Sequence, residues 1–393
     1  MLVESSIWYE HSPLIKNHLT KHPHYVLIVS PYLISMFLLQ IPVAFLIDEY
    51  GPRRIISIVM LISAIGMILL GLSIHMPGIS WMALFIIGIG GTVTFTSSFK
   101  MIANWFAPKS FSIMAGWTLF IAFIGSAIGQ KIDFFILSHF SWKTTIINYG
   151  LIAAVYALFV FLILRDEAPG VNYDMHPKIK ESSFKKALKK SLLSRGNWFM
   201  AISIGLIHGH RIPLIGLNVP IFTSLYGFSS KIANHINLYE LCFFVIGILF
   251  FSFLARWIKR RKILISIGTI LAAIFYLIPF YFPEFKTTTL FIFFSLSAFF
   301  AGSIFLIFIM IHESNIPQVT ATTTGMLVLA IAFFHLMMSW ISRIFLKTAG
   351  ISQSFRFTIG DSWLYLTIVP VSVILGLVLL LFTQETHGKQ KMK

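Results

Sequence analysis

Eleven long runs of apolar residues constrain this chain more than any other feature of its sequence. Nine runs contain no Asp, Glu, Lys or Arg, and the other two contain one such residue each, Arg211 and Glu240. A helix crosses the hydrocarbon core of a bilayer in about 20 residues. The runs are continuous and lack the alternation of barrel strands. They predict an all-α membrane protein with eleven transmembrane helices, at residues 25–47, 55–74, 79–99, 111–130, 144–164, 198–221, 234–255, 263–282, 289–311, 321–342 and 362–383.

The composition supports a chain whose solvent is largely lipid. Hydrophobic residues make up 57% of the sequence and charged residues 11%, whereas a soluble domain has about 25% charged residues. The net charge of +16 could suggest nucleic acid, but no basic and aromatic stripe stands clear of the apolar runs. We therefore expect no nucleic-acid partner. The single Cys242 rules out a disulfide framework or a cysteine zinc site.

Known catalytic patterns are missing from the sequence. It contains no HExxH, GxSxG, Walker A lysine or Rossmann unit. We expect neither an enzyme nor a self-contained ATP-driven pump, and we expect no cofactor.

Basic residues are distributed unequally between the two ends of the runs. The stretch DEYGPRR (48–54) and the other loops at that end carry 20 Lys and Arg, and the opposite loops carry 9. Because basic loops stay cytoplasmic, we expect the DEYGPRR end and Lys393 to lie inside the cell, in a multi-pass protein of the cell (inner) membrane. Gly51 permits a positive φ and Pro52 suits the first position of a helix, so DEYGPRR is expected to be a short turn.

An internal repeat divides the chain. FLIDEYGPRRI (45–55) aligns without gaps on FLARWIKRRKI (253–263), and the longest polar segment lies between the two copies. In that segment SFKKALKKSLLSR (183–195) is either an amphipathic helix on the inner membrane surface or a solvated basic loop. The predicted organisation is an external stub and loop (1–24), a five-span bundle (25–164), a basic cytoplasmic linker (165–197), a six-span bundle (198–384) and a cytoplasmic tail (385–393).

AFLIDEYGPRR resembles the signature loop of the major facilitator superfamily, Gly-x-Leu-Ala-Asp-Arg-x-Gly-Arg-Arg-Arg. The matching residues are Leu46, Asp48, Gly51, Arg53 and Arg54. The departures are Ala44 for Gly, Glu49 for Arg and, in the second copy, Arg256 at the aspartate position. The resemblance implies two six-helix bundles around a central cavity that opens alternately to each side, carrying small solutes, often with protons.

We therefore expect a monomeric secondary transporter for a small polar or anionic solute, with proton symport favoured. The alternative is a membrane sensor or assembly partner with the same fold and no transport. Gly116, Gly125 and Gly129 match the spacing of the family's antiporter signature, but Gln130 replaces its proline, which favours uptake. The glycines by themselves indicate close helix packing.

Arg211 is the first candidate for a solute or coupling residue. A charge at mid-span costs about 2.5–3.5 kcal/mol on insertion scales and normally faces the protein interior. His208, Arg211 and Asn218 fall on one face at helical spacing, and Pro213 leaves the carbonyl of Gly209 without its helical partner. The alternative is a purely structural ion pair between Arg211 and Glu240.

Glu240 is the second candidate, six residues into its run and about 9 Å deep. It is either a proton carrier or a structural partner of Arg211. Other polar residues are more consistent with structure than with function. These are the mid-span His335, the hydroxyls Thr92, Thr94, Thr96 and Ser98, and the histidines His11, His18, His22 and His24, of which His18 and His22 have metal-ligand spacing without further ligands.

The two halves of the repeat are unequal. One span precedes the first signature loop, at 25–47, and two follow the linker before the second, at 198–221 and 234–255. We therefore expect that the family's first transmembrane helix is absent from this sequence and that MLVESSIWYEHSPLI corresponds to its external end.

Overall fold

The computed structural model describes residues 25–73, 76–168, 181–209, 222, 226–281, 285–348 and 359–390. Within these ranges the regular structure is entirely helical. The chain divides into two compact units. The first unit comprises Met1–Ala107, Ile124–Leu192 and Ile316–Leu329, and the second comprises Pro108–Phe123, Leu193–Asn315 and Ala330–Lys393.

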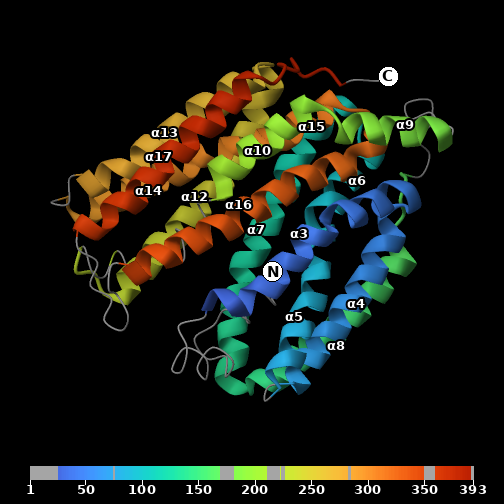
Figure 1. The fold of residues 1–393 in the computed structure, drawn as a ribbon, viewed down its shortest axis with the longest axis horizontal. Coiled ribbons are helices and arrows are strands. Elements are labelled where there is room, and N and C mark those ends of the chain that lie inside the picture. The colour runs from blue at the N-terminus through green and yellow to red at the C-terminus, as the bar shows by residue number, and fades with distance from the viewer. Residues whose placement is uncertain are drawn as a thin grey trace. The chain divides into compact units, whose positions relative to one another are not determined.

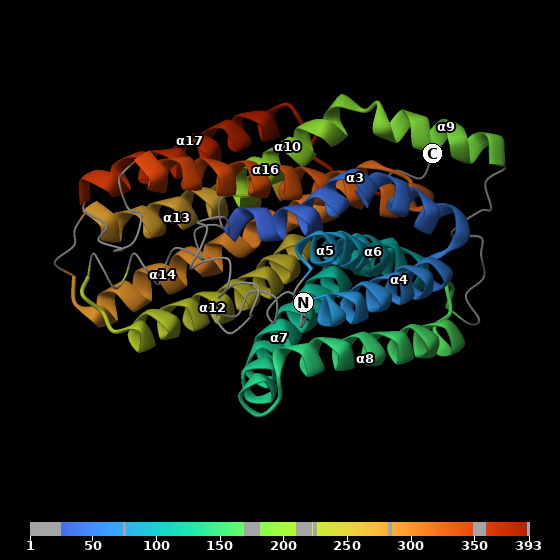
Figure 2. The same cartoon turned by 60° about the horizontal axis from the view of Figure 1, so that its bottom comes forward.

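The first unit is built around α4, which packs against α8 and α5, while α3 packs against α5 (Figures 1 and 2). Its core includes Leu70, Leu84, Ile87 and Ile146. The elements of this unit are α3 (Tyr25–Tyr50), α4 (Pro52–Leu72), α5 (Pro77–Gly91), α6 (Val93–Trp105), the second part of α7 (Pro108–His139), α8 (Trp142–Ile163), α9 (Glu181–Leu192), the 3-10 helix η3 (Pro317–Val319) and the start of α16 (Thr320–Thr348).

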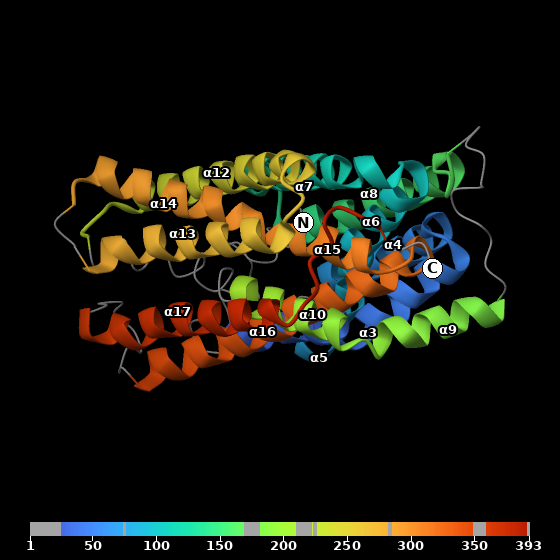
Figure 3. The same ribbon diagram turned by 90° about the horizontal axis from the view of Figure 1, so that it is seen from above.

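In the second unit α14 packs against α12 and α13, and α10 packs against α17 (Figure 3). One core cluster includes Phe222, Ile236, Leu290 and Phe294. The elements are the first part of α7, α10 (Arg195–Gly209), α12 (Ser230–Trp257), α13 (Arg261–Tyr281), α14 (Thr287–Ala301), the 3-10 helix η2 (Gly302–Phe305), α15 (Leu306–Ser314), the rest of α16 and α17 (Ile359–Leu381).

Nine helical segments of the described residues are long and apolar enough to cross a membrane. They confirm the predicted membrane fold, although two predicted spans are interrupted. The run 79–99 falls on α5 and α6, which meet at Thr92, and the run 289–311 falls on α14, η2 and α15. The second interruption lies where η2 and α12 approach closely, since a Cβ on Gly302 would lie 2.4 Å from the Ile248 backbone nitrogen.

The helical alternative for the linker is confirmed over Glu181–Leu192, the helix α9. Phe184 stacks on Phe45 of α3, with 6.3 Å between the ring centroids. One side of α9 is therefore held by the protein. Its position on a membrane surface remains a prediction.

The predicted close packing of glycines is confirmed at Gly116. A Cβ there would lie 2.5 Å from the Cβ of Ser252 on α12. Gly125 differs, because a Cβ on it would meet no described atom within 4 Å. The signature spacing thus combines glycines with different surroundings.

Gly51 makes the turn between α3 and α4 with φ +88°, and Pro52 is the first residue of α4. This turn was predicted correctly, but it is shorter than expected, because Asp48 and Glu49 belong to the last turn of α3. A Cβ on Gly51 would also lie 2.7 Å from the Asp166 carboxylate. Backbone angle and available space therefore both require glycine here.

We expect Gly51→Ala to destabilise the protein by about 1–3 kcal/mol, because alanine strains this backbone region and displaces Asp166. Gly78→Ala is the matched control, since Gly78 lies in α5 with open space around its Cα. The control should be neutral or stabilise by up to about 1 kcal/mol. Thermal unfolding of both variants in detergent measures the difference, and equal melting temperatures would contradict the assignment.

Candidate functional site

Asp48 connects α3 to the beginning of α16 within the first unit. Its Oδ1 accepts a hydrogen bond from the Ala321 backbone N–H (3.1 Å) and its Oδ2 accepts one from the Thr322 N–H (2.7 Å). The first N–H groups of a helix have no partner within the helix, and a carboxylate there also interacts favourably with the helix dipole. Asp48 therefore caps α16.

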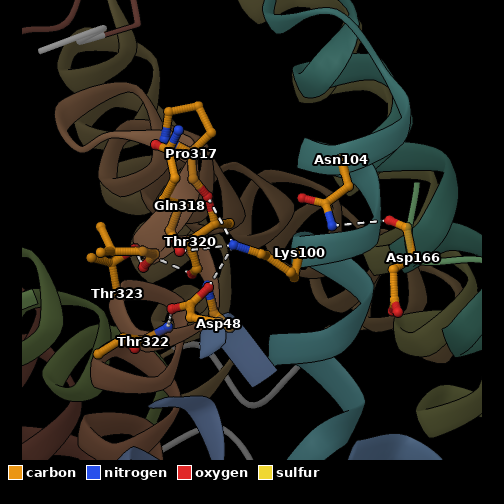
Figure 4. A network of polar contacts seen from close by, with 11 residues as sticks. Asp48, Lys100, Asn104, Asp166, Pro317, Gln318, Thr320, Thr322 and Thr323 are labelled. Atoms are coloured by element: carbon orange, nitrogen blue, oxygen red, sulfur yellow. Dashed lines mark hydrogen bonds and ion pairs between the residues drawn. The ribbon is translucent and has the colours of Figure 1, made fainter. Parts of the chain in front are cut away.

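Lys100 of α6 neutralises this carboxylate. Its Nζ lies 2.8 Å from Asp48 Oδ1, and the two side chains are 7% and 0% exposed. The same ammonium donates to the carbonyls of Pro317 (3.2 Å) and Gln318 (2.8 Å) in η3. Figure 4 shows Lys100 pointing from α6 toward Asp48 and this segment. We call Asp48, Lys100 and the backbone of residues 317–322 the α16 clamp.

A second set of contacts ties the segment after α8 to the signature turn. The Asp166 carboxylate accepts a hydrogen bond from the Arg53 N–H (2.7 Å) at the start of α4. Asn104 Nδ2 donates to the Asp166 carbonyl (3.0 Å), also drawn in Figure 4. The Arg53 guanidinium lies 4.9 Å above the Phe161 ring, and its Nε donates to the Phe161 carbonyl (2.6 Å). Arg53 and Asp166 thus fix the ends of α4 and α8 together.

The second signature copy carries a corresponding cluster in the second unit. Glu385, which follows α17, accepts hydrogen bonds from the N–H groups of Arg261 (2.8 Å) and Lys262 (2.9 Å) at the start of α13. The Arg261 guanidinium pairs with Glu313 of α15 at 2.9 Å, with side chains 4% and 10% exposed. Thr386 donates a hydrogen bond to the other Glu313 oxygen.

The remaining residues of the two signature copies contribute less to the contacts described above, because their side chains are exposed. Arg54 and Glu49 are exposed, and Leu46 is 37% exposed. Arg256, at the aspartate position of the second copy, is exposed in the last turn of α12. Asp48, Gly51 and Arg53 therefore carry the geometry of the first copy.

Of the four predicted solute or coupling residues, the structure describes His208 and Glu240; Arg211 and Asn218 lie outside the described residues. His208 is buried near the end of α10, with its ring centroid 5.4 Å from that of Phe305 and 6.2 Å from that of Phe244. Glu240 is 6% exposed. It lies ten residues after Ser230, where α12 begins, which is about 15 Å along the helix and deeper than the sequence indicated.

The structural interpretation of the hydroxyl residues in the run 79–99 is confirmed for three of them. Thr92, Thr96 and Ser98 donate to the carbonyls of Ile89, Thr92 and Thr94, three or four residues earlier in the chain, each at 2.7 Å. No cluster of His, Cys, Asp or Glu suited to a metal occurs in the described part of the chain. The N-terminal histidines at 11, 18 and 22, together with His24, lie outside it.

Sequence reasoning missed several buried charged groups. Lys100 was counted as a loop residue, but it lies inside α6 and is buried. Asp133 was overlooked because its apolar run ended at Gln130, whereas α7 continues to His139. Asp133 is fully buried and accepts a hydrogen bond from the Tyr149 hydroxyl. Both residues lie within one helical turn of the end of an apolar run, and this position was the signal available in the sequence.

The described fold is that of a multi-pass helical membrane protein. The Major Facilitator Superfamily profile matches residues 8–339 of the sequence, and the chain belongs to this superfamily. The resemblance inferred from the signature loop is therefore confirmed.

Similar proteins include two nitrate/nitrite transporters named NrtP. Identity is 27% over 164 residues with that of Picosynechococcus sp. and 30% over 177 residues with that of Nostoc punctiforme. These matches cover 34% and 42% of this chain, and 30% and 33% of the relatives. The aligned part thus spans about a third of the length of these relatives.

Among solved structures, the fold is similar to that of the E. coli fucose:proton symporter FucP. The TM-score is 0.66 at 15% identity, and the similarity covers 97% of each chain. The proton:xylose symporter XylE bound to 6-bromo-6-deoxy-D-glucose gives a TM-score of 0.67 at 15% identity, covering 99% of this chain and 92% of that one. At 15% identity these similarities are evidence for the fold alone.

We expect Asp48→Asn to destabilise the α16 clamp, because it leaves the Lys100 ammonium buried without its carboxylate. Removing one partner of a buried ion pair costs about 3–5 kcal/mol. Glu49→Gln is the matched control, since Glu49 is the exposed neighbour on the same turn, and should change stability by less than about 0.5 kcal/mol.

The double variant Asp48→Asn/Lys100→Met should regain part of the loss, because the uncompensated charge is gone. Thermal unfolding in detergent measures all four proteins. A double variant no more stable than Asp48→Asn, or equal effects of Asp48→Asn and Glu49→Gln, would show that the ion pair does not stabilise this region.

Proposed function

We propose that this protein is a secondary active transporter that moves a small polar or anionic solute by alternating access, coupled to protons in symport. Membership of the superfamily supports the transport class. The fucose and xylose symporters of similar fold are named as proton-coupled, and the nitrate/nitrite relatives favour an anion.

The α16 clamp is the observation that carries the alternating-access proposal. Two buried charges hold the first turn of α16 against α3 and α6. The attraction of a buried ion pair is largely offset by the desolvation of its members. When the helices separate and water enters, both charges regain hydration. Such a contact can therefore hold one state firmly and still open as a unit, as a transport cycle requires.

The solute and coupling residues are proposals from the sequence, supported in part by burial. Arg211 is the proposed anion-binding residue, with His208 and Asn218 beside it on one helical face. Glu240 is the proposed proton carrier, because it is buried on a membrane-spanning helix, ten residues after the first residue of α12, and carboxyl groups inside transmembrane segments mark proton pathways.

We expect Arg211→Ala to abolish uptake, and Arg211→Lys to impair it at least tenfold because lysine lacks the planar donor fork. The measurement is initial uptake of nitrate, organic acids, amino acids and sugars into proteoliposomes, with and without an inward proton gradient. Lys109→Ala, a change at an exposed residue of α7, is the control for expression and reconstitution.

Uptake by Arg211→Ala at the wild-type rate would remove Arg211 from the mechanism. An uptake rate that does not depend on the proton gradient would show that transport is not coupled to protons. Absence of any flux through the wild-type protein would favour the sensor or assembly role instead.

The cytoplasmic location of the signature turns is a further proposal, and it places Lys391 inside the cell. In a Cys242→Ser background, which removes the exposed native thiol, a cysteine substituted for Lys391 should be protected from impermeant thiol reagents in intact cells. It should react after permeabilisation. Ready labelling of intact cells would reverse the assigned orientation.

A further inference from the structure

Gln40 is a polar residue at membrane depth in α3. It lies ten residues before the end of the helix at Tyr50, which corresponds to about 15 Å, or half of a hydrocarbon core of about 30 Å. Its side chain is buried, with 1% of its surface exposed. The signature turn lies at the end of the same helix.

Close packing between α3 and α5 brings Gln40 to the junction of α5 and α6. A Cβ on Gly88 would lie 2.5 Å from the Tyr32 carbonyl oxygen, so glycine is needed for the two helices to approach this closely. At the junction, Gln40 Nε2 donates a hydrogen bond to the Thr92 carbonyl (3.0 Å). Only the NH₂ side of a carboxamide can donate to a carbonyl. The contact therefore fixes the orientation of the amide.

The other side of this amide, Oε1, accepts no hydrogen bond within the described structure. The hydroxyl groups at and just after the residue that Gln40 contacts are already used, since Thr92 donates to the Ile89 carbonyl and Thr96 donates to the Thr92 carbonyl. Gly325 of α16 packs against the backbone of α3 here, since a Cβ on this glycine would lie 3.6 Å from the Gln40 backbone carbonyl oxygen. Gly325 itself has no side chain that could donate to the amide.

Three other buried hydroxyl groups without a partner have a simpler explanation. The hydroxyls of Ser97, Thr322 and Thr324 can rotate toward carbonyls of their own helices. The Gln40 amide cannot rotate without losing its hydrogen bond to Thr92. A fixed, buried and unsatisfied acceptor is rare in a folded protein and requires a reason.

We propose that Gln40 Oε1 accepts a hydrogen bond from a hydroxyl, amine or amide group of the transported solute. Gln40 is then a specificity-determining residue that favours solutes with an O–H or N–H donor over ions such as nitrate, which have none. This inference rests on the proposed transport function. Together with an anion-binding Arg211, it selects hydroxylated or aminated organic anions as the solute class.

The physical basis for this selectivity is an asymmetry between the two kinds of solute. A donor-bearing solute gives the buried oxygen the partner that it lacks. A solute without a donor leaves it desolvated and unpaired, and sites built for a hydrogen bond discriminate strongly against such analogues.

The test compares solutes that differ by one hydroxyl group. Initial uptake of lactate and propionate, and separately of nitrate, L-fucose and D-xylose, is measured in proteoliposomes of the 393-residue chain. The wild-type protein should prefer lactate to propionate by about tenfold in kcat/KM and should transport nitrate poorly. Equal uptake of lactate and propionate, or nitrate as the best solute, would overturn the proposal without any variant.

Gln40→Met, which keeps the side-chain length but removes the amide, should reduce lactate uptake about tenfold and change propionate uptake less than twofold. Ser35→Ala is the matched control on α3, since Ser35 is buried and its hydroxyl donates to its own helix at Tyr32 (2.9 Å). Gln40→Leu replaces Gln40→Met if the latter does not accumulate in the membrane.

Equal losses for lactate and propionate in Gln40→Met would mean that the oxygen binds an internal water or serves packing, and the proposal would be wrong. The test of transport itself is separate from the test of Gln40. If the wild-type protein takes up no solute in the panel, the proposed transport function fails and the role of Gln40 fails with it.

Discussion

The contact between Asp48 and the first turn of α16 is the interaction on which the arrangement of the first unit depends. The N–H groups at a helix start and the carbonyls of the preceding turn need partners wherever water is excluded. Asp48 supplies an acceptor to Ala321 and Thr322, and Lys100 supplies donors to the two carbonyls of η3. The two charges neutralise each other, so each one makes the burial of the other tolerable. A polar backbone segment and two charges are thereby accommodated at the meeting point of three helices.

The second signature copy also contains a buried ion pair, but at a different position of the motif, since Arg261 aligns with Arg53 and not with Asp48. In the first copy the acid lies on α3 and the base on α6. In the second copy the base, Arg261, lies at the start of α13 and the acid, Glu313, lies on α15. The carboxylate that caps the following helix keeps its place, since Asp166 follows α8 and Glu385 follows α17. Arg256 replaces the aspartate of the motif in the second copy, and its side chain is exposed. The acidic residue of the second ion pair is Glu313, which lies on another helix, α15.

The parts of the fold that depend on local sequence could be predicted, and the contacts between distant segments could not. The apolar runs, the linker helix and the turn at Gly51 follow from helix length, amphipathic spacing and backbone preference. Asp48 and Thr322 are 274 residues apart in sequence, and no local pattern pairs them. Lys100 was assigned to a loop because a long aliphatic side chain at the end of an apolar run looks the same whether it reaches water or a buried carboxylate. The environments of Arg211 and Asn218 remain predictions, whereas Glu240 is deeper than expected because α12 begins four residues earlier than its apolar run.

Charged and neutral polar groups occupy different depths in the first unit, and their chemistry suits different tasks. Asp48 lies in the last turn of α3 and pairs there with Lys100, where separation of the helices would return both of them to water. Gln40 lies near the middle of α3, where an unpaired charge would cost far more than an unpaired amide oxygen. A neutral group can therefore be left partly unsatisfied at this depth, which a charge cannot. This difference in desolvation explains how one helix can combine a buried ion pair at its end with an unpaired amide oxygen near its centre.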